Sequence, residues 1–445
     1  MAELEFTPAV MPAREERRRG RVIHNPWVRR LVSFLMVWGP GLIVMEADND
    51  AGAVSTYVQA GAQYGLHLLW TLLLLLPITY CVQEMVARLG IATGRGHAVL
   101  IYRRFGKWWG LFSMIDLQVL NFCTLVTEFA AIALAVRAAG VPPQIGVPLF
   151  AVGLVAVVAT GAYLRWERTV MALCLLDVAW VALAGRLGVP GPEVVRHALV
   201  PTIPPGGVTA DLVLLTVALV GTTVAPWQLF FQQSCVVDKR LRSGDLPWER
   251  LDTFLGACFT IVVAGAMMLV GDAARVHGIR FTDPAQLAVS LGAVYGPLVR
   301  NALLGLMCNA AVLGTIAVSL SSAWAYGEVR GWSHSLQDPV WRAPGFYGLY
   351  VAAVGAAAGF VLIPGAPLQV IILGVQVLAG LMLPPALVFL QLMLNDRQLL
   401  DERFANKPWH NWVNWTIIAV LCALSLLLAA EVLLPGLFPT TSPGG

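Results

Sequence analysis

Apolar runs of about twenty residues recur along almost the whole sequence, from residue 33 to residue 434. An α-helix needs about that length to cross the hydrocarbon core of a bilayer, and only helices and closed barrels satisfy their backbone polar groups there. Charged residues make up 12% of the chain, against about 25% in soluble domains. The sequence therefore predicts an all-α multispanning membrane protein that sits in the lipid bilayer. Its net charge of +3 does not indicate a nucleic-acid partner.

The apolar runs divide into eleven predicted spans, and no loop between them is long enough for a separate domain. The first residues are polar and Arg-rich, without the apolar core of a signal peptide. We expect a cytoplasmic tail over 1–30 and a ten-helix core over 31–395. A cytoplasmic loop, an eleventh helix and a short extracellular tail follow over 396–445. The predicted spans lie in 33–62, 67–89, 109–138, 146–164, 168–187, 211–235, 252–272, 297–327, 346–363, 367–394 and 411–434.

The distribution of lysine and arginine predicts the orientation of these spans, because cytoplasmic loops carry the excess of positive charge. With the N-terminus inside, 23 of the 29 basic residues fall in the tail and the loops on the cytoplasmic side. Five fall on the other side, and Arg300 lies near the start of the eighth span. The bias predicts a cytoplasmic N-terminus and, after eleven spans, an extracellular C-terminus. We expect the protein in the plasma membrane of a prokaryote, as a monomer.

Two predicted spans are interrupted near their middles. The first span contains DNDAGA (48–53), and the sixth contains GTTVAP (221–226), whose proline lacks a backbone donor and clashes one turn back. Backbone left unpaired at membrane depth is tolerated only where it is buried in protein or lines a cavity. Broken helices at matching places in two five-helix halves indicate an inverted-repeat transporter with a binding site at the midplane. The ten-helix core would then be the transport core.

Three carboxylates, Glu46, Asp48 and Asp50, lie beside the first break. A charge at the bilayer centre costs at least about 2.5–3.5 kcal/mol on insertion scales, so these groups need a cation or a path to water. Carboxylates and free carbonyls are hard oxygen ligands that suit Mg²⁺, Ca²⁺ or Mn²⁺. Glu46 and Asp48 could equally face water near the end of a shorter span, whereas Asp50 lies at the break itself. Asp177, also inside a span, is expected to bond a neighbouring helix.

Four stretches of the chain resemble the NRAMP (natural resistance-associated macrophage protein) family of divalent-metal transporters. They are DAGAVSTYVQAGAQYG (50–65), ARLGIATGR (87–95), GTTVAPW (221–227) and VQVLAGLMLPPALVFL (375–390). The resemblance covers nearly the whole chain. It implies the LeuT-like fold of the APC superfamily, a five-plus-five inverted repeat with broken helices 1 and 6 and an added eleventh helix. It also implies a transporter without a cofactor, and no HExxH or GxSxG motif in the spans points to an enzyme.

The resemblance implies four metal ligands: Asp50, the backbone carbonyl of Thr222, Glu128 and Gln376. Asp50 keeps the aspartate of the family's helix 1 motif, and Gln376 keeps a glutamine that lines the site from helix 10. Glu128 keeps one acid of the family's acidic pair on helix 3. Two simpler interpretations stay open. Glu128 could be a structural acid bonded to a neighbouring residue or helix, and Gln376 could support a contact between helices.

Five positions depart from the family's pattern. Ala53 stands where the family has an asparagine ligand, and Ala225 stands where it has a methionine ligand. Ala131 replaces the second acid on helix 3, while Trp227 and Gln232 replace two helix 6 histidines. These last three positions belong to the family's proton path, and we expect Trp227 to fill the space of the missing histidine.

These departures favour a particular branch of the family. A thioether ligand favours softer transition metals, whereas a wider site with one or two carboxylates suits Mg²⁺, which usually keeps several waters. The pattern resembles the NRAMP-related magnesium transporters, which carry Mg²⁺ and Mn²⁺.

The histidines bear on proton coupling. None of the seven is predicted in the middle of a span, and histidine is the usual switch near neutral pH. We therefore expect import of a partly hydrated ion by alternating access, driven by its gradient and the membrane potential without proton coupling. A proton-coupled Mn²⁺/Fe²⁺ importer with altered ligands is the alternative. An amino-acid transporter is disfavoured, because Asp50 would repel a substrate carboxylate.

Overall fold

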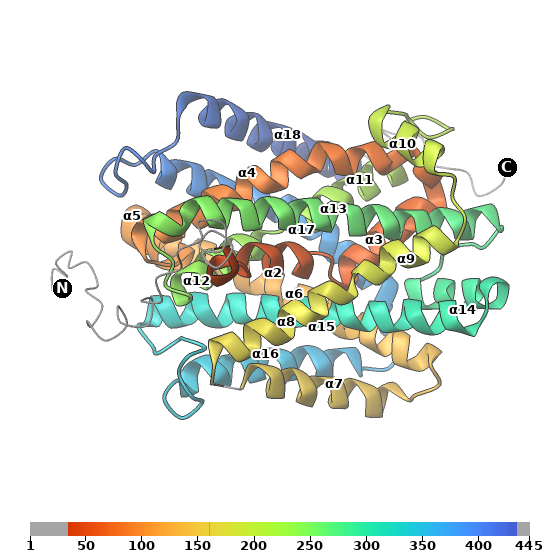
Figure 1. Cartoon of the computed structure of the whole chain (residues 1–445), viewed down its shortest axis with the longest axis horizontal. Coiled ribbons are helices and arrows are strands. Elements are labelled where there is room, and N and C mark those ends of the chain that lie inside the picture. The colour runs from red at the N-terminus through yellow and green to blue at the C-terminus, as the bar shows by residue number, and fades with distance from the viewer. Residues whose placement is uncertain (1–33, 160, 434–445) are drawn as a thin grey trace, which may run out of the picture.

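The protein folds into a bundle of helices that lie roughly along one axis, with short helices at both ends (Figure 1). The structure is a computed structural model that describes residues 34–159 and 161–433. α5 (His97–Phe105) lies at one end of the bundle, while α10 (Gly191–Leu199) and α14 (Pro284–Tyr295) lie at the other. We call these the α5 end and the α14 end. The predicted cytoplasmic tail over 1–30 and the residues after 433 lie outside the described residues.

Two spans are broken helices, as predicted. Helix 1 consists of α2 (Pro40–Ala47) and α3 (Ala51–Tyr64), and helix 6 consists of α11 (Ala210–Thr223) and α12 (Pro226–Asp238). Helix 1 runs from the α5 end toward the α14 end and helix 6 runs the opposite way (Figure 1). This opposite direction is what an inverted repeat requires.

Both breaks are shorter than the sequence predicts. Only 48–50 leave the helix in the first break and 224–225 in the second. Ala51 begins α3 because Asp50 caps that helix with its side chain. Pro226 begins α12 because a proline in the first helical turn has no backbone bond to lose.

The remaining spans are continuous or nearly so. Helix 5 is divided by Asp177 alone into α8 (Tyr163–Leu176) and α9 (Val178–Arg186), a division that the sequence did not predict. The 3-10 turns η2 (Gly65–Leu68) and η3 (Ser243–Asp245) precede α4 and α13. The other spans are α4 (Leu69–Thr93), α6 (Lys107–Ala138), α7 (Pro143–Val158), α13 (Leu246–Val276), α15 (Pro297–Arg330), α16 (Pro344–Val361), α17 (Leu368–Leu394) and α18 (Pro408–Leu433).

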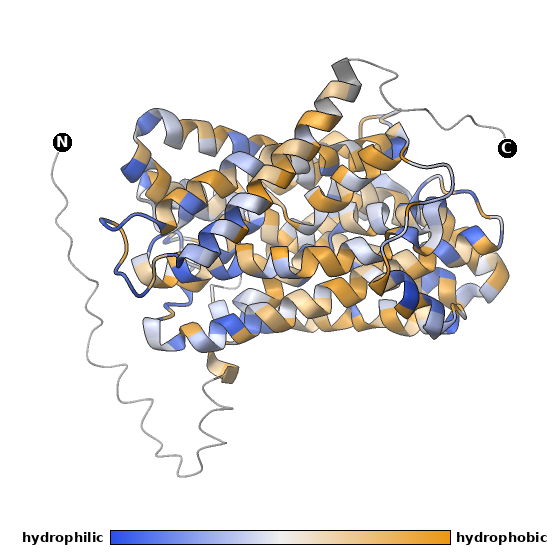
Figure 2. Cartoon of the chain, turned by 90° about the horizontal axis from the view of Figure 1, so that it is seen from above, coloured by the Kyte–Doolittle hydropathy of each residue, from blue (hydrophilic) through white to orange (hydrophobic). Residues whose placement is uncertain are grey.

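Length and composition alone qualify nine stretches of the described chain as membrane spans. One of the nine stretches contains both α3 and α4, which belong to two different spans. α7 is a further span that is not among the nine, because it has only 16 residues. The count is therefore eleven. Hydrophobic residues predominate along the middle of the bundle, and hydrophilic residues are more frequent toward its two ends (Figure 2). The predicted all-α multispanning fold is confirmed.

Glycines let the second half of helix 1 lie directly against α13. A Cβ atom on Gly61 of α3 would collide with the backbone carbonyl of Met268, and one on Gly271 of α13 would collide with that of Val58. The two backbones therefore touch, as is common where small residues line an interface between membrane helices. This contact holds α3 in place against α13, and it therefore also positions Ala51, where the break in helix 1 ends.

We predict that Gly271→Val destabilises the folded protein by at least about 1–3 kcal/mol, because the new side chain must displace backbone. Gly265→Val, on the same helix, is the matched control, since its Cβ would meet only Leu69 Cδ1 at 3.7 Å and Leu72 Cδ1 at 4.0 Å. Thermal unfolding in detergent, followed by size-exclusion chromatography, measures both. Equal melting temperatures for the two variants would contradict the close packing.

Candidate metal centre

Asp50 ends the break in helix 1 and caps the helix that follows. Its Oδ1 accepts a hydrogen bond of 2.8 Å from the backbone N–H of Ala53. The first N–H groups of a helix have no partner within the helix, and the helix N-terminus carries a partial positive charge. The side chain is only 4% exposed. The start of α3, rather than water, therefore stabilises negative charge on Asp50.

Glu128 reaches the same helix start from α6. Its Oε2 accepts a hydrogen bond of 3.1 Å from the backbone N–H of Ala51, and its Oε1 has no partner among the described residues. The Asp50 and Glu128 carboxyl groups therefore bond N–H groups of the same helix turn. Gly314 of α15 faces both, since a Cβ there would lie 2.7 Å from Glu128 Cδ and 2.8 Å from Asp50 Cβ. Three helices thus converge on one pair of carboxylates.

Gln376 brings an amide to this pair from α17. The side chain is buried and lies so close to Gly52 that a Cβ on that glycine would collide with the amide. The same Cβ position is 3.1 Å from Asp50 Oδ1, so the amide and the carboxylate are neighbours. The Gln376 amide nitrogen forms no hydrogen bond within the described residues, while the side chain packs α17 closely against α3.

Thr222 supplies a free backbone carbonyl at the end of α11. In a continuous helix this carbonyl would accept from the N–H four residues on, but that residue is Pro226, which has none. The hydroxyl of Tyr57 on α3 lies 2.7 Å from that of Thr223. This bond holds the end of α11 beside α3.

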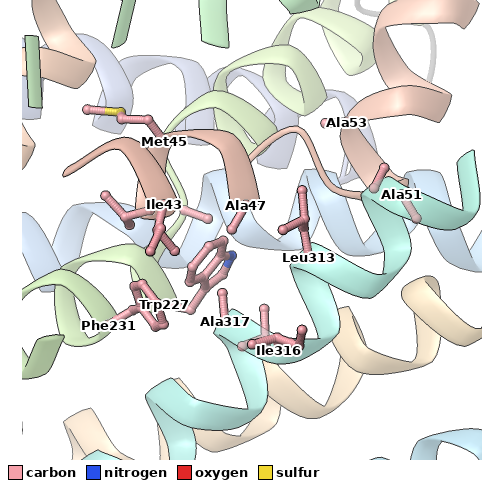
Figure 3. Close-up of a cluster of buried hydrophobic side chains, with 14 of the residues drawn as sticks. Ile43, Met45, Ala47, Ala51, Ala53, Trp227, Phe231, Leu313, Ile316 and Ala317 are labelled. Carbon is pink, nitrogen blue, oxygen red and sulfur yellow. The ribbon is translucent and has the colours of Figure 1, made fainter. Parts of the chain in front are cut away.

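Trp227 occupies space beside the first half of helix 1. Figure 3 shows its indole ring among Ile43 and Ala47 of α2, Phe231 of α12 and Ala317 of α15. The ring is fully enclosed, and the Trp227 carbonyl accepts from a serine hydroxyl of α15 at 3.2 Å. An apolar ring therefore stands where the family's pattern has a histidine.

The other departures from the family's pattern are also buried. Ala53, Ala131 and Ala225 contribute only methyl groups to the interior. Gln232 lies apart from Asp50, because its amide donates to Thr253 Oγ1 at 3.0 Å on α13. It is thus a contact between α12 and α13.

The interpretation that Glu46 and Asp48 face water is wrong. Glu46 is buried and its Oε1 accepts from the Thr260 hydroxyl at 2.9 Å. Asp48 is buried and accepts a hydrogen bond from the Gln228 amide. The polar partners sit on α13 and α12, and no feature of helix 1 in the sequence indicates them.

The expectation for Asp177 is confirmed. It accepts from the Asn309 amide of α15 at 3.0 Å, which is a bond between helices and not a contact with the break.

Histidines are absent from the middle of every described span. His97 is the most buried of them, and its Nδ1 lies 2.9 Å from Gln233 Oε1, for which it must be the donor. Burial lowers the pKa of His97 to about 4, so this imidazole is neutral near pH 7. His24 falls outside the described residues. The others, in loops, short end helices or near helix ends, are His67, His197, His277, His334 and His410.

The ligand set at the break is small. Among the described residues, no three His, Cys, Asp or Glu side chains are grouped so that they could hold a metal ion. The arrangement offers two carboxylates, a side-chain amide and a freed backbone carbonyl. The oxygens of these groups are hard ligands, whereas the amide nitrogen cannot bind a cation. Such a set suits a hard divalent cation that keeps part of its water.

Comparison with known proteins places the chain in a family. The profile of the family described as "Natural resistance-associated macrophage protein-like" matches residues 41–431. The chain belongs to the Nramp family. A curated relative, the divalent metal cation transporter MntH of Staphylococcus saprophyticus, is 25% identical over 433 residues, which cover 92% of this chain and 94% of the relative. The relatives are transporters, which confirms the prediction that the protein is not an enzyme.

Solved structures show the same fold. The manganese transporter of Eremococcus coleocola superposes with a TM-score of 0.70 at 16% identity, covering 91% of this chain and 88% of that one. Mhp1, a nucleobase-cation-symport-1 family transporter in a closed conformation, gives a TM-score of 0.55 at 15% identity, covering 91% and 94%. The predicted LeuT-like fold is confirmed.

We predict that Asp50→Ala abolishes divalent-cation binding, because it removes the carboxylate held at the start of α3. Glu128→Gln should weaken binding without abolishing it. Isothermal titration of the purified protein with Mn²⁺ as probe measures both. Asp116→Ala is the matched control, since Asp116 lies on the same helix as Glu128 but about 18 Å nearer the α5 end at 1.5 Å per residue. Unchanged affinity in Asp50→Ala would contradict this site.

Proposed function

We propose that the protein imports divalent metal cations, Mg²⁺ and Mn²⁺, by alternating access through the site at Asp50. The observation that carries this proposal is the pair of buried carboxylates, Asp50 and Glu128, held at the start of α3 inside a broken membrane helix. The Gln376 side-chain amide lies beside Asp50, and the carbonyl of Thr222, freed by Pro226, supplies a neutral oxygen. Membership of the Nramp family supports the assignment, since curated relatives are named divalent metal cation transporters.

The preference for Mg²⁺ follows from what the site lacks. Ala225 lies in the two-residue break of helix 6, where the family's pattern has a methionine, and Ala53 follows closely on Asp50. Neither methyl group can coordinate a cation, and no thioether discriminates against hard ions. The shorter side chains also leave room for the waters that Mg²⁺ releases reluctantly. A partly hydrated ion is therefore the expected cargo.

Transport without proton coupling is supported by the missing histidines. No described histidine lies mid-span, and Trp227 and Ala131 cannot titrate. The buried Glu46 and Asp48 are bonded to α13 and α12, and Glu128 contacts the Asp50 region itself. The membrane potential suffices as driving force, because a divalent cation gains about 4.6 kcal/mol per 100 mV. That is enough for roughly a thousandfold accumulation.

One observation favours the alternative, a proton-coupled Mn²⁺/Fe²⁺ importer. Asp50 and Glu128 both bond the first turn of α3, and two like charges held this close repel each other, so one of the two carboxyl groups can hold a proton when no cation is bound. An arriving cation would displace that proton. Whether the proton then crosses the membrane with the cation separates the two proposals.

The orientation is also proposed from the sequence. The excess of lysine and arginine places the α5 end in the cytoplasm and the α14 end outside. Import then runs from the α14 end to the α5 end, in the plasma membrane of a prokaryote and by a monomer.

We predict Mg²⁺ influx into proteoliposomes at an inside-negative potential of about 100 mV, with no change in internal pH. A fluorescent Mg²⁺ indicator and a trapped pH dye record both signals in one experiment, and Asp50→Ala provides the inactive control. Proton influx in a fixed ratio to Mg²⁺ would favour the coupled alternative. No Mg²⁺ influx at all would overturn the substrate assignment.

We predict that Ala225→Met lowers Mg²⁺ uptake relative to Mn²⁺ and Cd²⁺ uptake by about tenfold, equivalent to about 1.4 kcal/mol, because a thioether prefers softer metals. Ala225→Leu is the matched control, since it adds similar bulk without sulfur. If both variants changed the uptake ratio equally, size rather than ligand chemistry would set the preference.

A further inference from the structure

A cavity of about 570 Å³ opens at the α14 end between α6, α7 and the segment that joins α16 to α17. One basic and one acidic side chain, Arg137 and Asp283, lie in its wall, so the cavity has no strong charge of its own. Its other polar side chains are Gln144 and Gln369.

Gln369 lines this cavity and also contacts α3. Its amide nitrogen donates a hydrogen bond of 2.8 Å to the hydroxyl of Ser55 on α3, and Ser55 is fully buried. The Gln369 amide oxygen is buried and has no partner among the described residues. One neutral hydrogen bond thus joins α17 to α3 beside the cavity.

The position of this bond relates it to the metal site. Gln369 and Gln376 are seven residues apart on α17, which places them on the same helix face, about 10 Å apart along the axis. They meet α3 at Ser55 and Gly52, which are three residues apart and lie on one side of that helix. Because α3 and α17 run in opposite directions, Ser55 and Gln369 both lie on the α14 side of Asp50.

We propose that Ser55 and Gln369 form the outer gate of the transport path, and that the amide oxygen of Gln369 is the first protein ligand that an entering cation meets. This proposal rests on the proposed transport of divalent cations through the Asp50 site. In the closed arrangement the hydrogen bond joins α3 to α17 and separates the cavity from Asp50. When the two helices part, the amide oxygen, a hard donor suited to a hydrated divalent cation, turns toward the path.

Thiol accessibility tests the gate without requiring transport. A cysteine reporter at Ala53 is labelled from the α14 side by a membrane-impermeant thiol reagent, and peptide mass spectrometry quantifies labelling at that residue alone, apart from the seven native cysteines. Ser55→Ala and Gln369→Ala should each accelerate labelling several-fold. Gln144→Ala, which alters the same cavity away from α3, should leave the rate unchanged. Equal rates in all variants would overturn the gate, whatever the cargo proves to be.

Cross-linking tests whether the gate must open during the cycle. In the Ser55→Cys/Gln369→Cys double variant, oxidation should join α3 to α17 and abolish Mn²⁺ uptake, and reduction should restore it. Each single variant should take up Mn²⁺ at the same rate with and without the oxidant, whatever that rate is relative to the parent protein. Uptake at the parent rate by cross-linked protein would overturn the proposal, as would failure of the two cysteines to join in protein that elutes as a single species.

The ligand role of Gln369 is tested by kinetics. Gln369→Leu keeps the side chain's bulk but removes its oxygen, and it should raise the KM for external Mn²⁺ several-fold. Gln144→Leu should leave the KM unchanged. If Gln369→Leu lowered only the maximal rate, Gln369 would support the helix contact without binding the cation, and the ligand role would be excluded.

Discussion

The first turn of α3 is the element on which the proposed site depends. Its N–H groups bond Asp50 and Glu128, so two buried carboxylates are stabilised by the end of a helix. The ion pairs formed by the described residues lie elsewhere, and the buried ones, Lys239–Glu167 and Arg88–Glu84, do not involve this pair. A lysine or arginine side chain paired with these carboxylates would neutralise the site permanently. Helix dipoles lower the cost of negative charge and leave full neutralisation to a mobile cation.

Both halves of helix 1 pack against α13, and the break lies between the two contacts. α3 lies backbone to backbone against α13, and so does α2 at Gly41, where a Cβ would lie 2.6 Å from the backbone nitrogen of Thr253. Side chains add to the contact of α2: Asp252 of α13 accepts from the N–H groups of Gly39 and Gly41 at 3.1 and 2.8 Å, and Lys239 donates to the two carbonyls just before them. Since 48–50 are not helical, motion of one half need not drag the other. Alternating access requires this kind of independence on the two sides of a central site.

Much of the fold follows from local rules. Span length predicts the number of helices, the Pro226 position predicts the second break, and a buried acid beside a break predicts Asp50 as the centre. The rest depends on contacts between segments far apart in the sequence. Gly314 faces the carboxylates only because α15 packs against α6 and α3. Likewise, Glu46 and Asp48 accept hydrogen bonds from side chains on α13 and α12. The sequence of helix 1 alone could not distinguish these buried, hydrogen-bonded acids from acids that face water.

Anomalous diffraction from crystals grown with Mn²⁺ tests the central claim most directly. We predict a single strong peak in the transport core, beside the Asp50 carboxylate and between the first turn of α3, Gln376 and the end of α11. It should be absent in Asp50→Ala crystals grown in the same way. A peak elsewhere in the core, with none at Asp50 under saturating Mn²⁺, would contradict the assignment of the site.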